Sequence, residues 1–314
     1  MRLNHQKLRQ LNWINRLQSL MLLALMCGYV WLVGRWVIGE GFGLFAGLFV
    51  IGLMLFNPAF SPRVILRAYR ATPITVYDAP ELHHALRVLA QRAGLEKVPS
   101  LHYIPVGTMN AFAMGLQGNA SIALSDGLLR QLSLEEVLGV LAHEVSHIRH
   151  NDMFIMATAD LMGQMARLLS FAAQGLVLLS VPLILLGEVS IQWLPVFIIM
   201  AAPIVSALIQ LAISRKREFL ADLSAAELMG QPDPLIRALA KLERQNSYWE
   251  RFYRASSDNA LLRTHPTTAE RIAQLQAVAE SAAWEPLVVP HQVSSPWMSQ
   301  TAIHPRRISR YFWL

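Results

Sequence analysis

Four long apolar stretches constrain this chain more than any other feature of its sequence. They cover residues 17–34, 36–56, 168–187 and 189–213, and only Glu40 within them is charged. A helix needs about 20 mostly apolar residues to cross the hydrocarbon core of a bilayer. The stretches therefore predict an integral membrane protein with four transmembrane helices in two hairpins. The first two are short and rich in glycine, so a re-entrant pair is the alternative there.

The composition of the chain excludes several other classes of protein. Of the 314 residues, 54% are hydrophobic and 15% are charged, whereas soluble domains carry about 25% charged residues. The single cysteine, Cys27, excludes an internal disulfide framework and a cysteine-rich metal site. A cleaved signal peptide is not expected at the first stretch, because a second apolar stretch follows it without a small-residue cleavage site.

Basic residues gather beside the apolar stretches on one side of the predicted membrane. The two opposite connections hold only Arg35 with Glu40, and Glu188. Since lysine and arginine near span ends favour the cytoplasmic side, both termini are predicted to be cytoplasmic. The net charge of +6 then reflects membrane topology and contacts with the lipid bilayer, and we expect no nucleic-acid partner. The clustered residues are Arg2, Lys7, Arg9, Arg16, Arg63, Arg67, Arg70, Arg215, Lys216 and Arg217.

The polar segment between the two hairpins predicts a compact α/β unit. Short strands are expected at residues 74–77 and 101–104. Two apolar runs, 111–115 and 120–124, are joined by the Leu-Gln-Gly-Asn sequence typical of a hairpin. The fold class is therefore an α+β integral membrane protein.

Helix starts in this unit are marked by their first residues. Pro80 suits the first position of one helix, and Ser125 precedes a short one. Ser133 and Glu136 form a capping box that opens a longer helix. Beyond the fourth stretch, helices are expected at residues 215–229, 234–245 and 267–279.

These patterns divide the chain into five parts. Each hairpin is followed by a polar part, and the last part is an irregular tail without clear periodicity. The predicted parts are a transmembrane hairpin at 1–60, the α/β subdomain at 61–152, a second transmembrane hairpin at 153–213, a helical subdomain at 214–284 and the tail at 285–314.

The helix that Ser133 opens contains a spacing typical of metal sites. His143 and His147 are four residues apart and so face the same side of a helix, one turn from each other. Two imidazoles in this arrangement can bind one Zn²⁺, and Glu144 between them can act as general base on a water. Because so short a pattern also arises by chance, two ordinary solvated histidines are the alternative.

A third zinc ligand is expected beyond the second hairpin. Catalytic zinc usually has three protein ligands and an open position. The hairpin returns the chain to the same side of the membrane, so Glu218 emerges beside the histidines. Asp222, on the same helix face, can accept the free ring N–H of a ligating histidine. A structural alternative for Glu218 is an ion pair with Arg215 or Arg217.

Together these segments resemble those of the HtpX-type membrane zinc metallopeptidases, which are relatives of the eukaryotic CAAX prenyl proteases. The resemblance rests on HEVSHI at 143–148, SRKREFLAD at 214–222 and NAFAMG at 110–115, with THP at 264–266 and ERI at 270–272 downstream. It extends over the order of the spans and nearly all of the chain up to about residue 276.

The resemblance implies a gluzincin-like fold, one zinc ion per chain, endopeptidase activity and a role in bacterial membrane-protein quality control. It also implies that the strand with Asn110, Ala111, Phe112 and Ala113 binds extended substrate by strand addition. An ordinary hairpin strand is the alternative. The sequence departs from the family pattern in the tail and at His150, which we expect at the surface near the membrane.

His265 is the second candidate catalytic residue. It precedes Pro266, which disfavours helical geometry and places it in an extended turn. Three roles remain open for it. It can donate to the oxyanion, occupy the fourth zinc position of a resting enzyme, or simply pack on the following helix.

The sequence thus predicts a zinc metalloendopeptidase of the bacterial inner membrane, with its active site in the cytoplasm and Glu144 as general base. Its expected partners are protein or peptide substrates, chiefly misfolded membrane proteins. Two rival functions are a prenyl-protein processing protease and a non-catalytic zinc-binding membrane scaffold. Four spans argue against the first, because prenyl-protein proteases generally have more spans, and the presence of Glu144 argues against the second.

Overall fold

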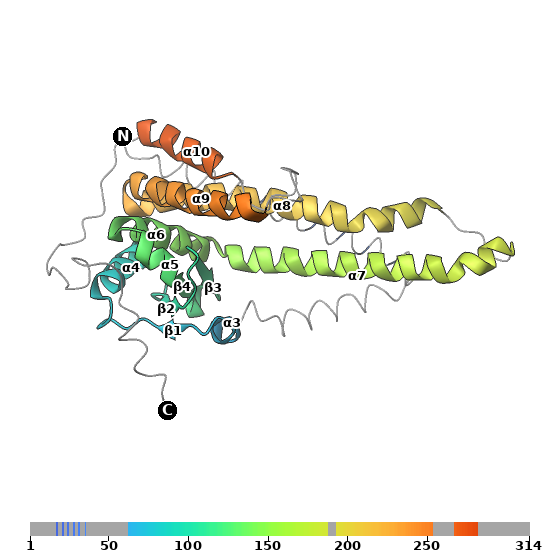
Figure 1. Cartoon of the computed structure of the whole chain (residues 1–314), viewed down its shortest axis with the longest axis horizontal. Coiled ribbons are helices and arrows are strands. Elements are labelled where there is room, and N and C mark those ends of the chain that lie inside the picture. The colour runs from blue at the N-terminus through green and yellow to red at the C-terminus, as the bar shows by residue number, and fades with distance from the viewer. Residues whose placement is uncertain are drawn as a thin grey trace, which may run out of the picture.

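The computed structural model describes residues 62–187, 193–253 and 267–281, with six isolated positions near the N-terminus. Most of the first two apolar stretches, His265 and the tail at 285–314 lie outside the described residues. A globular unit stands at one end of the molecule, and two long helices project from it side by side (Figure 1).

A four-stranded sheet forms the centre of the globular unit. Its strands are β1 (Thr72–Pro73), β2 (Ser100–Ile104), β3 (Ala111–Met114) and β4 (Ser121–Ser125), arranged in the order β1-β2-β4-β3. The two central strands are parallel, and each outer strand is antiparallel to its neighbour. The predicted second strand and hairpin are therefore confirmed, and β3 is an edge strand.

The strand predicted at residues 74–77 is wrong. The strand that pairs with β2 covers only Thr72–Pro73, followed by one bond from Ile74 N to Leu101 O at 2.9 Å, and the chain then turns. The carboxylate of Asp78 accepts hydrogen bonds from Thr75 N at 2.9 Å and Thr75 Oγ1 at 2.6 Å. An aspartate that bonds to backbone a few residues away favours a turn over a strand.

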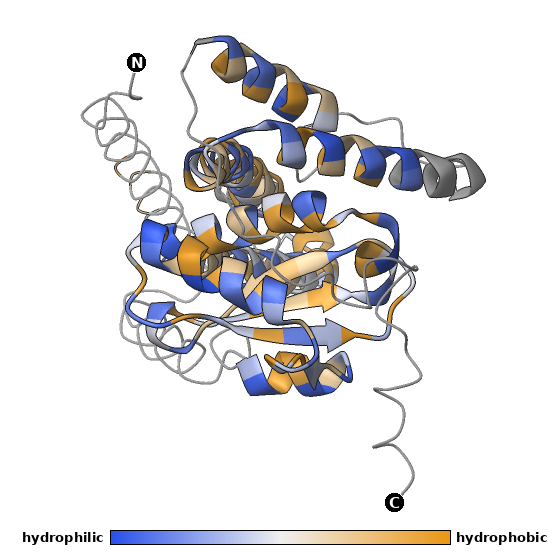
Figure 2. Ribbon diagram, turned by 90° about the vertical axis from the view of Figure 1, so that its left-hand side faces the viewer, coloured by the Kyte–Doolittle hydropathy of each residue, from blue (hydrophilic) through white to orange (hydrophobic). Residues whose placement is uncertain are grey.

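Side chains of the sheet alternate between two apolar layers. Leu101, Tyr103, Ile122 and Leu124 pack against α4 (Pro80–Ala93) and α6 (Leu134–His150) in the main core. Neighbouring residues on the opposite face pack against α3 (Pro62–Ala68). Viewed from the globular end, the sheet lies between most of the helices and the short α3 below it (Figure 2).

The helix with the paired histidines, α6, has defined ends. The predicted capping box is present, with Ser133 N donating to Glu136 Oε2 at 2.7 Å and Glu136 N donating to Ser133 Oγ at 3.4 Å. At the other end Asn151 adopts a left-handed conformation, with φ of 55°. The next helix, α7 (Asp152–Leu185), begins at once, so a single residue separates the two.

Two helices in the described part of the chain are long and apolar enough to cross a membrane: α7 and α8 (Trp193–Met229). Their outer halves expose large apolar side chains, such as Leu179 at 77% and Leu185 at 82%, as lipid-facing helices do. The helix α8 runs through residue 213 without a break. The remaining helices are α5 (Asp126–Gln131), α9 (Asp233–Tyr253) and α10 (Thr268–Ser281).

Candidate metal centre

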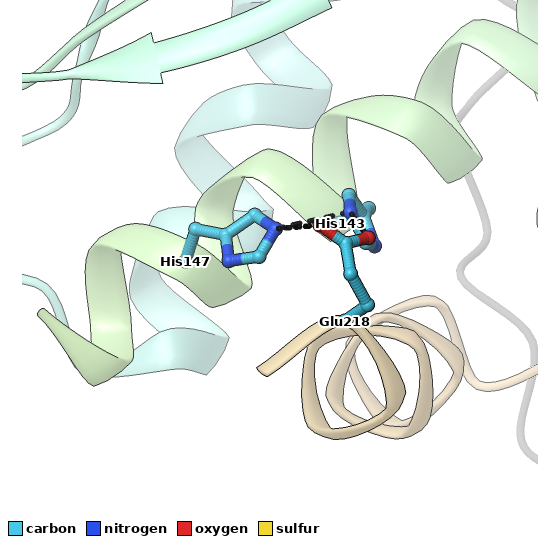
Figure 3. Close-up of side chains that lie close together, drawn as sticks. All are labelled: His143, His147 and Glu218. Carbon is cyan, nitrogen blue, oxygen red and sulfur yellow. Dashed lines mark hydrogen bonds and ion pairs between the residues drawn. The ribbon is translucent and has the colours of Figure 1, made fainter. Parts of the chain in front are cut away.

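Three side chains from two helices converge beside the sheet. Nε2 of His143 lies 3.1 Å from Nε2 of His147, and both face the carboxylate of Glu218 at 3.5 and 4.0 Å. One ligand atom from each residue lies within 4.8 Å of the others. Figure 3 shows both imidazoles on α6, with Glu218 reaching them from α8. The three predicted zinc ligands are thus close enough to bind a single ion.

The local fold explains this convergence. The i, i+4 spacing on α6 turns both rings to one side of the helix. Because α7 and α8 form an antiparallel pair, α8 returns along α6 and carries Glu218 to the histidines. His143 is buried and Glu218 is partly buried, so the site is largely shielded from water.

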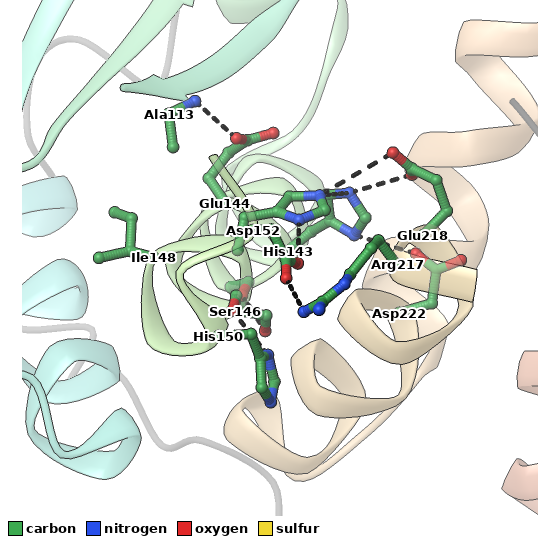
Figure 4. A network of polar contacts seen from close by, with 12 residues as sticks. Ala113, His143, Glu144, Ser146, Ile148, His150, Asp152, Arg217, Glu218 and Asp222 are labelled. Carbon is green, nitrogen blue, oxygen red and sulfur yellow. Dashed lines mark hydrogen bonds and ion pairs between the residues drawn. The ribbon is translucent and has the colours of Figure 1, made fainter. Parts of the chain in front are cut away.

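Each histidine also faces a buried carboxylate through its other ring nitrogen. Nδ1 of His143 lies 3.0 Å from Asp222 Oδ1, as the sequence predicts. Nδ1 of His147 lies 2.8 Å from Asp152 Oδ2, which sequence reasoning missed (Figure 4). Asp152 is the first residue of α7, and the left-handed turn at Asn151 directs it back toward α6.

Two arginines in turn neutralise these carboxylates. Arg271 donates from Nε and Nη2 to Asp222 at 2.7 and 2.6 Å, and its Nη1 lies 3.2 Å from Glu218. The buried Arg217 donates to Asp152. Burial alone would raise the pKa of Asp222, but its hydrogen bonds with Arg271 and His143 hold that pKa below its usual value. Both aspartates therefore remain ionised acceptors for the histidine N–H groups.

This donor set fits a zinc-type cation. Two imidazole nitrogens and one carboxylate oxygen are the ligands of many catalytic zinc sites. With a carboxylate beside each Nδ1, Nε2 is the atom of each ring that is placed to coordinate an ion. Burial lowers the pKa of His143, but contacts with Asp222 and Glu218 raise it to about 10 overall. The surroundings thus favour positive charge at this place, and a bound cation would supply it.

Glu144 lies on the sheet side of the paired histidines. It is buried, and its Oε2 accepts a hydrogen bond from Ala113 N at 2.7 Å (Figure 4). The predicted general base therefore contacts the edge strand β3 directly.

The other residues of the predicted substrate strand have different surroundings. Asn110 N donates to the side-chain Oγ of Ser125 at 2.8 Å, and Asn110 O accepts from Ser125 N at 3.0 Å. Ala111 packs at the margin of the main core on the α6 side. The ring of Phe112 lies on the opposite face, 5.2 Å from the ring of Tyr69.

His150 does not lie at the surface as we expected, because it is only 4% exposed. Its Nδ1 lies 2.8 Å from Ser146 O, one turn earlier on α6. The ring lies on the same side of α6 as His143 but two turns further on, and it is not part of the group whose ligand atoms meet, so it does not compete for the ion.

Comparison with known proteins identifies relatives over most of the chain. Residues 77–279 match the description "Peptidase family M48". A "Protease HtpX homolog" from Campylobacter curvus is 36% identical over 278 residues, which cover 82% of this chain and 95% of that protein. A "Protease HtpX" from Legionella pneumophila is 34% identical over 291 residues, covering 84% and 99%.

A similar solved structure is "Crystal Structure of S. mikatae Ste24p". It superposes with a TM-score of 0.51 at 22% identity, covering 84% of this chain and 66% of that longer one. At this identity the likeness concerns the fold alone.

Proposed function

This chain belongs to peptidase family M48, and from that premise we propose that it is a zinc-dependent endopeptidase with its active site on the cytoplasmic side of the membrane. Its relatives and its long apolar helices make it a membrane metalloprotease that acts on peptides or proteins. The proposal adds the identity of the metal, the residues of the mechanism and the side on which they act.

One observation carries the proposal. The ligand atoms of His143, His147 and Glu218 meet within 4.8 Å, and Glu144 lies on the same helix with its carboxylate turned toward an edge strand. A site that only stored or sensed zinc would need the three ligands but no base beside them. The arrangement supports hydrolysis of an extended chain laid between β3 and the ion.

Different residues of the chain have different roles in the proposed hydrolysis of the peptide bond. When bound, zinc supplies Lewis-acid activation of water and of the scissile carbonyl. Glu144 accepts a proton from the attacking water and donates it to the leaving amine. Asp152 and Asp222 keep the two histidines in the tautomer that leaves Nε2 free. His265 remains our candidate donor to the oxyanion, with a resting-ligand role and a structural role as alternatives.

The register of β3 defines which backbone groups are free for substrate. Asn110 pairs with Ser125, and antiparallel residues alternate in the edge to which their N–H and C=O point. The backbone N–H and C=O of Phe112 therefore point to β4, whereas the same groups of Ala111 and Ala113 point to the open edge of the sheet. A substrate strand would add at Ala111 and at the carbonyl of Ala113, whose N–H already donates to Glu144, with little dependence on the side chains of the substrate.

We place the protein in a bacterial inner membrane, with four spans and both termini in the cytoplasm. The one-sided arginine clusters and the HtpX relatives support this placement. Misfolded membrane proteins are the proposed substrates. A parallel digest of an unfolded membrane protein and of a prenylated peptide distinguishes this class from prenyl-protein processing.

Metal analysis combined with Glu144→Gln tests the proposal. The purified full chain should contain about one zinc ion, and Glu144→Gln should keep it while casein cleavage falls by roughly 10²- to 10⁴-fold, because the amide cannot accept the proton. Glu135→Gln, at an exposed position on the same helix, is the matched control and should cleave normally. Full activity of Glu144→Gln, or a chain without zinc, would contradict the proposal.

A further inference from the structure

Three arginines surround a hollow on the side of the sheet away from the metal centre. The hollow has a volume of about 460 Å³ and lies between α3, the turn that follows it, β1 and β2. Its polar lining consists of Arg63, Arg67, Arg70, Thr72 and His102.

This hollow is separate from the site described above. Residues alternate along β2, so His102 faces α3 while its neighbours Leu101 and Tyr103 face α6. The sheet itself therefore stands between the arginines and the ion site.

Within residues 62–187, 193–253 and 267–281, no carboxylate balances the positive charge of the hollow. Arg63 and Arg67 are four residues apart on α3, and Arg70 follows in a left-handed turn with φ of 49°. All three are exposed, and within the described part of the chain no carboxylate forms an ion pair with them. Three guanidinium groups around one concavity repel one another, and an anion bound between them would offset this repulsion.

Two uncharged polar atoms in the same lining also lack partners. Thr72 Oγ1 and His102 Nδ1 are both buried without a hydrogen bond in the described structure. Thr72 Oγ1 can donate its proton, and His102 Nδ1 can donate in the tautomer that carries the ring proton there. A buried polar atom without a partner costs free energy unless a ligand or water pairs with it. Together with the arginine forks they form a set of donors that suits a phosphate group.

We propose that this hollow binds the phosphate group of an anionic ligand, and that an anionic phospholipid is the favoured source. The helix α3 follows the second apolar stretch after a few residues, so the second predicted span would end close to it in sequence. In Figure 1, α3 lies at the level where α7 leaves the globular unit. A headgroup bound there would fix the height and tilt of the globular unit over the bilayer.

The binding experiment uses the purified full chain in a non-ionic detergent. Soluble dihexanoyl phosphatidylglycerol, dihexanoyl phosphatidylcholine and glycerol 1-phosphate are titrated separately, and binding is followed by thermophoresis. Saturable phosphatidylglycerol binding that glycerol 1-phosphate does not displace supports the lipid source. Equal or tighter binding of glycerol 1-phosphate supports the same phosphate site with a free ester as ligand. Absence of saturable binding of either compound overturns the proposal.

Variants separate a built site from general surface attraction. Arg67→Gln should weaken phosphatidylglycerol binding about fivefold, since one basic residue near a lipid surface contributes about 1 kcal/mol. Arg67→Lys keeps the charge but loses the planar fork, and Thr72→Val keeps the shape but loses the hydroxyl, so both should also weaken binding. Arg87→Gln, at an exposed position on α4, should have no effect.

The opposite pattern would refute the site. If Arg87→Gln weakens binding as much as Arg67→Gln while Arg67→Lys and Thr72→Val bind normally, the attraction is general and no site exists. Casein cleavage by each variant checks the fold, because none of these residues belongs to the proposed catalytic machinery.

Discussion

Each histidine of the metal centre is oriented by a carboxylate from another helix, and each carboxylate by an arginine. Asp152 and Arg217 serve His147, and Asp222 and Arg271 serve His143. Burial of so many charges is costly unless every partner is present. Hydrogen bonding to His147 and the nearby Arg217 hold the pKa of Asp152 below its usual value despite burial. The precision of the site therefore depends on residues that need not touch the ion.

Asp152→Asn should weaken metal binding by about 10- to 100-fold, because the amide no longer fixes the tautomer of His147. Competition against a chelator, at a temperature well below unfolding, gives the affinity. Asp160→Asn lies on the same helix, α7, at an exposed position and serves as control. Unchanged affinity of Asp152→Asn would show that this carboxylate only pairs with Arg217.

The sequence predicts part of this residue-level picture. Helical spacing suffices to bring His143 and His147 together, and the hairpin argument brings Glu218 to them. Asp152 escapes prediction because its direction depends on one left-handed residue between two helices, which hydrophobic periodicity does not reveal. The signal that could have identified Asp152 is its place as a polar residue at the start of a helix that follows α6 after a single residue.

At the level of elements, α6 is the helix around which the others assemble. It packs against α4, α8, α9 and the sheet, and most of its residues are buried. Its approach to α9 is especially close at Gly139. A Cβ atom there would lie 2.8 Å from Leu235 N and 3.0 Å from Pro234 C, both of them backbone atoms.

Gly139→Ala should therefore destabilise the fold, although alanine is the better helix former. The gain in helix propensity is about 1 kcal/mol, whereas overpacking costs about 1–3 kcal/mol. The melting temperature of the purified chain should fall as α9 is pushed away. The melting temperature of Gly118→Ala should not fall, because nothing lies within 4 Å of the new methyl group there. Equal melting temperatures for the two variants would argue against close packing of α6 and α9.

Ala113→Pro tests the contact between the edge strand and Glu144, the proposed general base. The N–H of Ala113 points to the open edge, so proline removes the bond to Glu144 but no ladder bond. We expect kcat/KM to fall roughly tenfold or more, because a hydrogen bond to a charged group typically contributes at least that much. The melting temperature should stay near normal. Phe112→Pro removes a ladder bond and should instead lower the melting temperature. Undiminished cleavage by Ala113→Pro would exclude this edge from the mechanism.

Local sequence signals explain which elements can be predicted. The capping box at Ser133 and the hairpin from residue 111 to 124 are set by neighbouring residues, and both are confirmed. The strand expected at 74–77 fails because the carboxylate of Asp78 bonds to Thr75 and closes a turn. The continuity of α8 is not predicted, since the sequence indicates a span up to residue 213 and a separate helix from residue 215, whereas the structure has one unbroken helix.

On the scale of the whole molecule, the membrane and the metal centre share the same two helices. The helix α8 begins among the apolar residues and carries Glu218 near its other end, and α7 begins with Asp152 and ends among apolar residues. Placement of these helices in the bilayer therefore sets the positions of a proposed ligand and of the carboxylate beside His147. The resemblance to HtpX-type proteases, drawn from short motifs, is confirmed by relatives that match most of the chain.

This arrangement makes the orientation of the two helices a testable property of the enzyme. Glu188 is the only charged residue between the third and fourth apolar stretches, whereas basic residues gather at their other ends. The positive-inside rule then predicts that Glu188 lies outside the cytoplasm and that Lys97, in the globular unit, lies inside. Because Cys27 is the only cysteine, Cys27→Ser gives a background without thiols.

In that background, Glu188→Cys should react with a membrane-impermeant maleimide in intact spheroplasts. Lys97→Cys, exposed on the globular unit, should react only after lysis. Each variant is its own control, since lysis must render both thiols reactive if the protein is folded and inserted. Labelling of Lys97→Cys in intact spheroplasts would place the metal centre on the outer side. The peptide substrates would then have to be sought among proteins outside the cytoplasm.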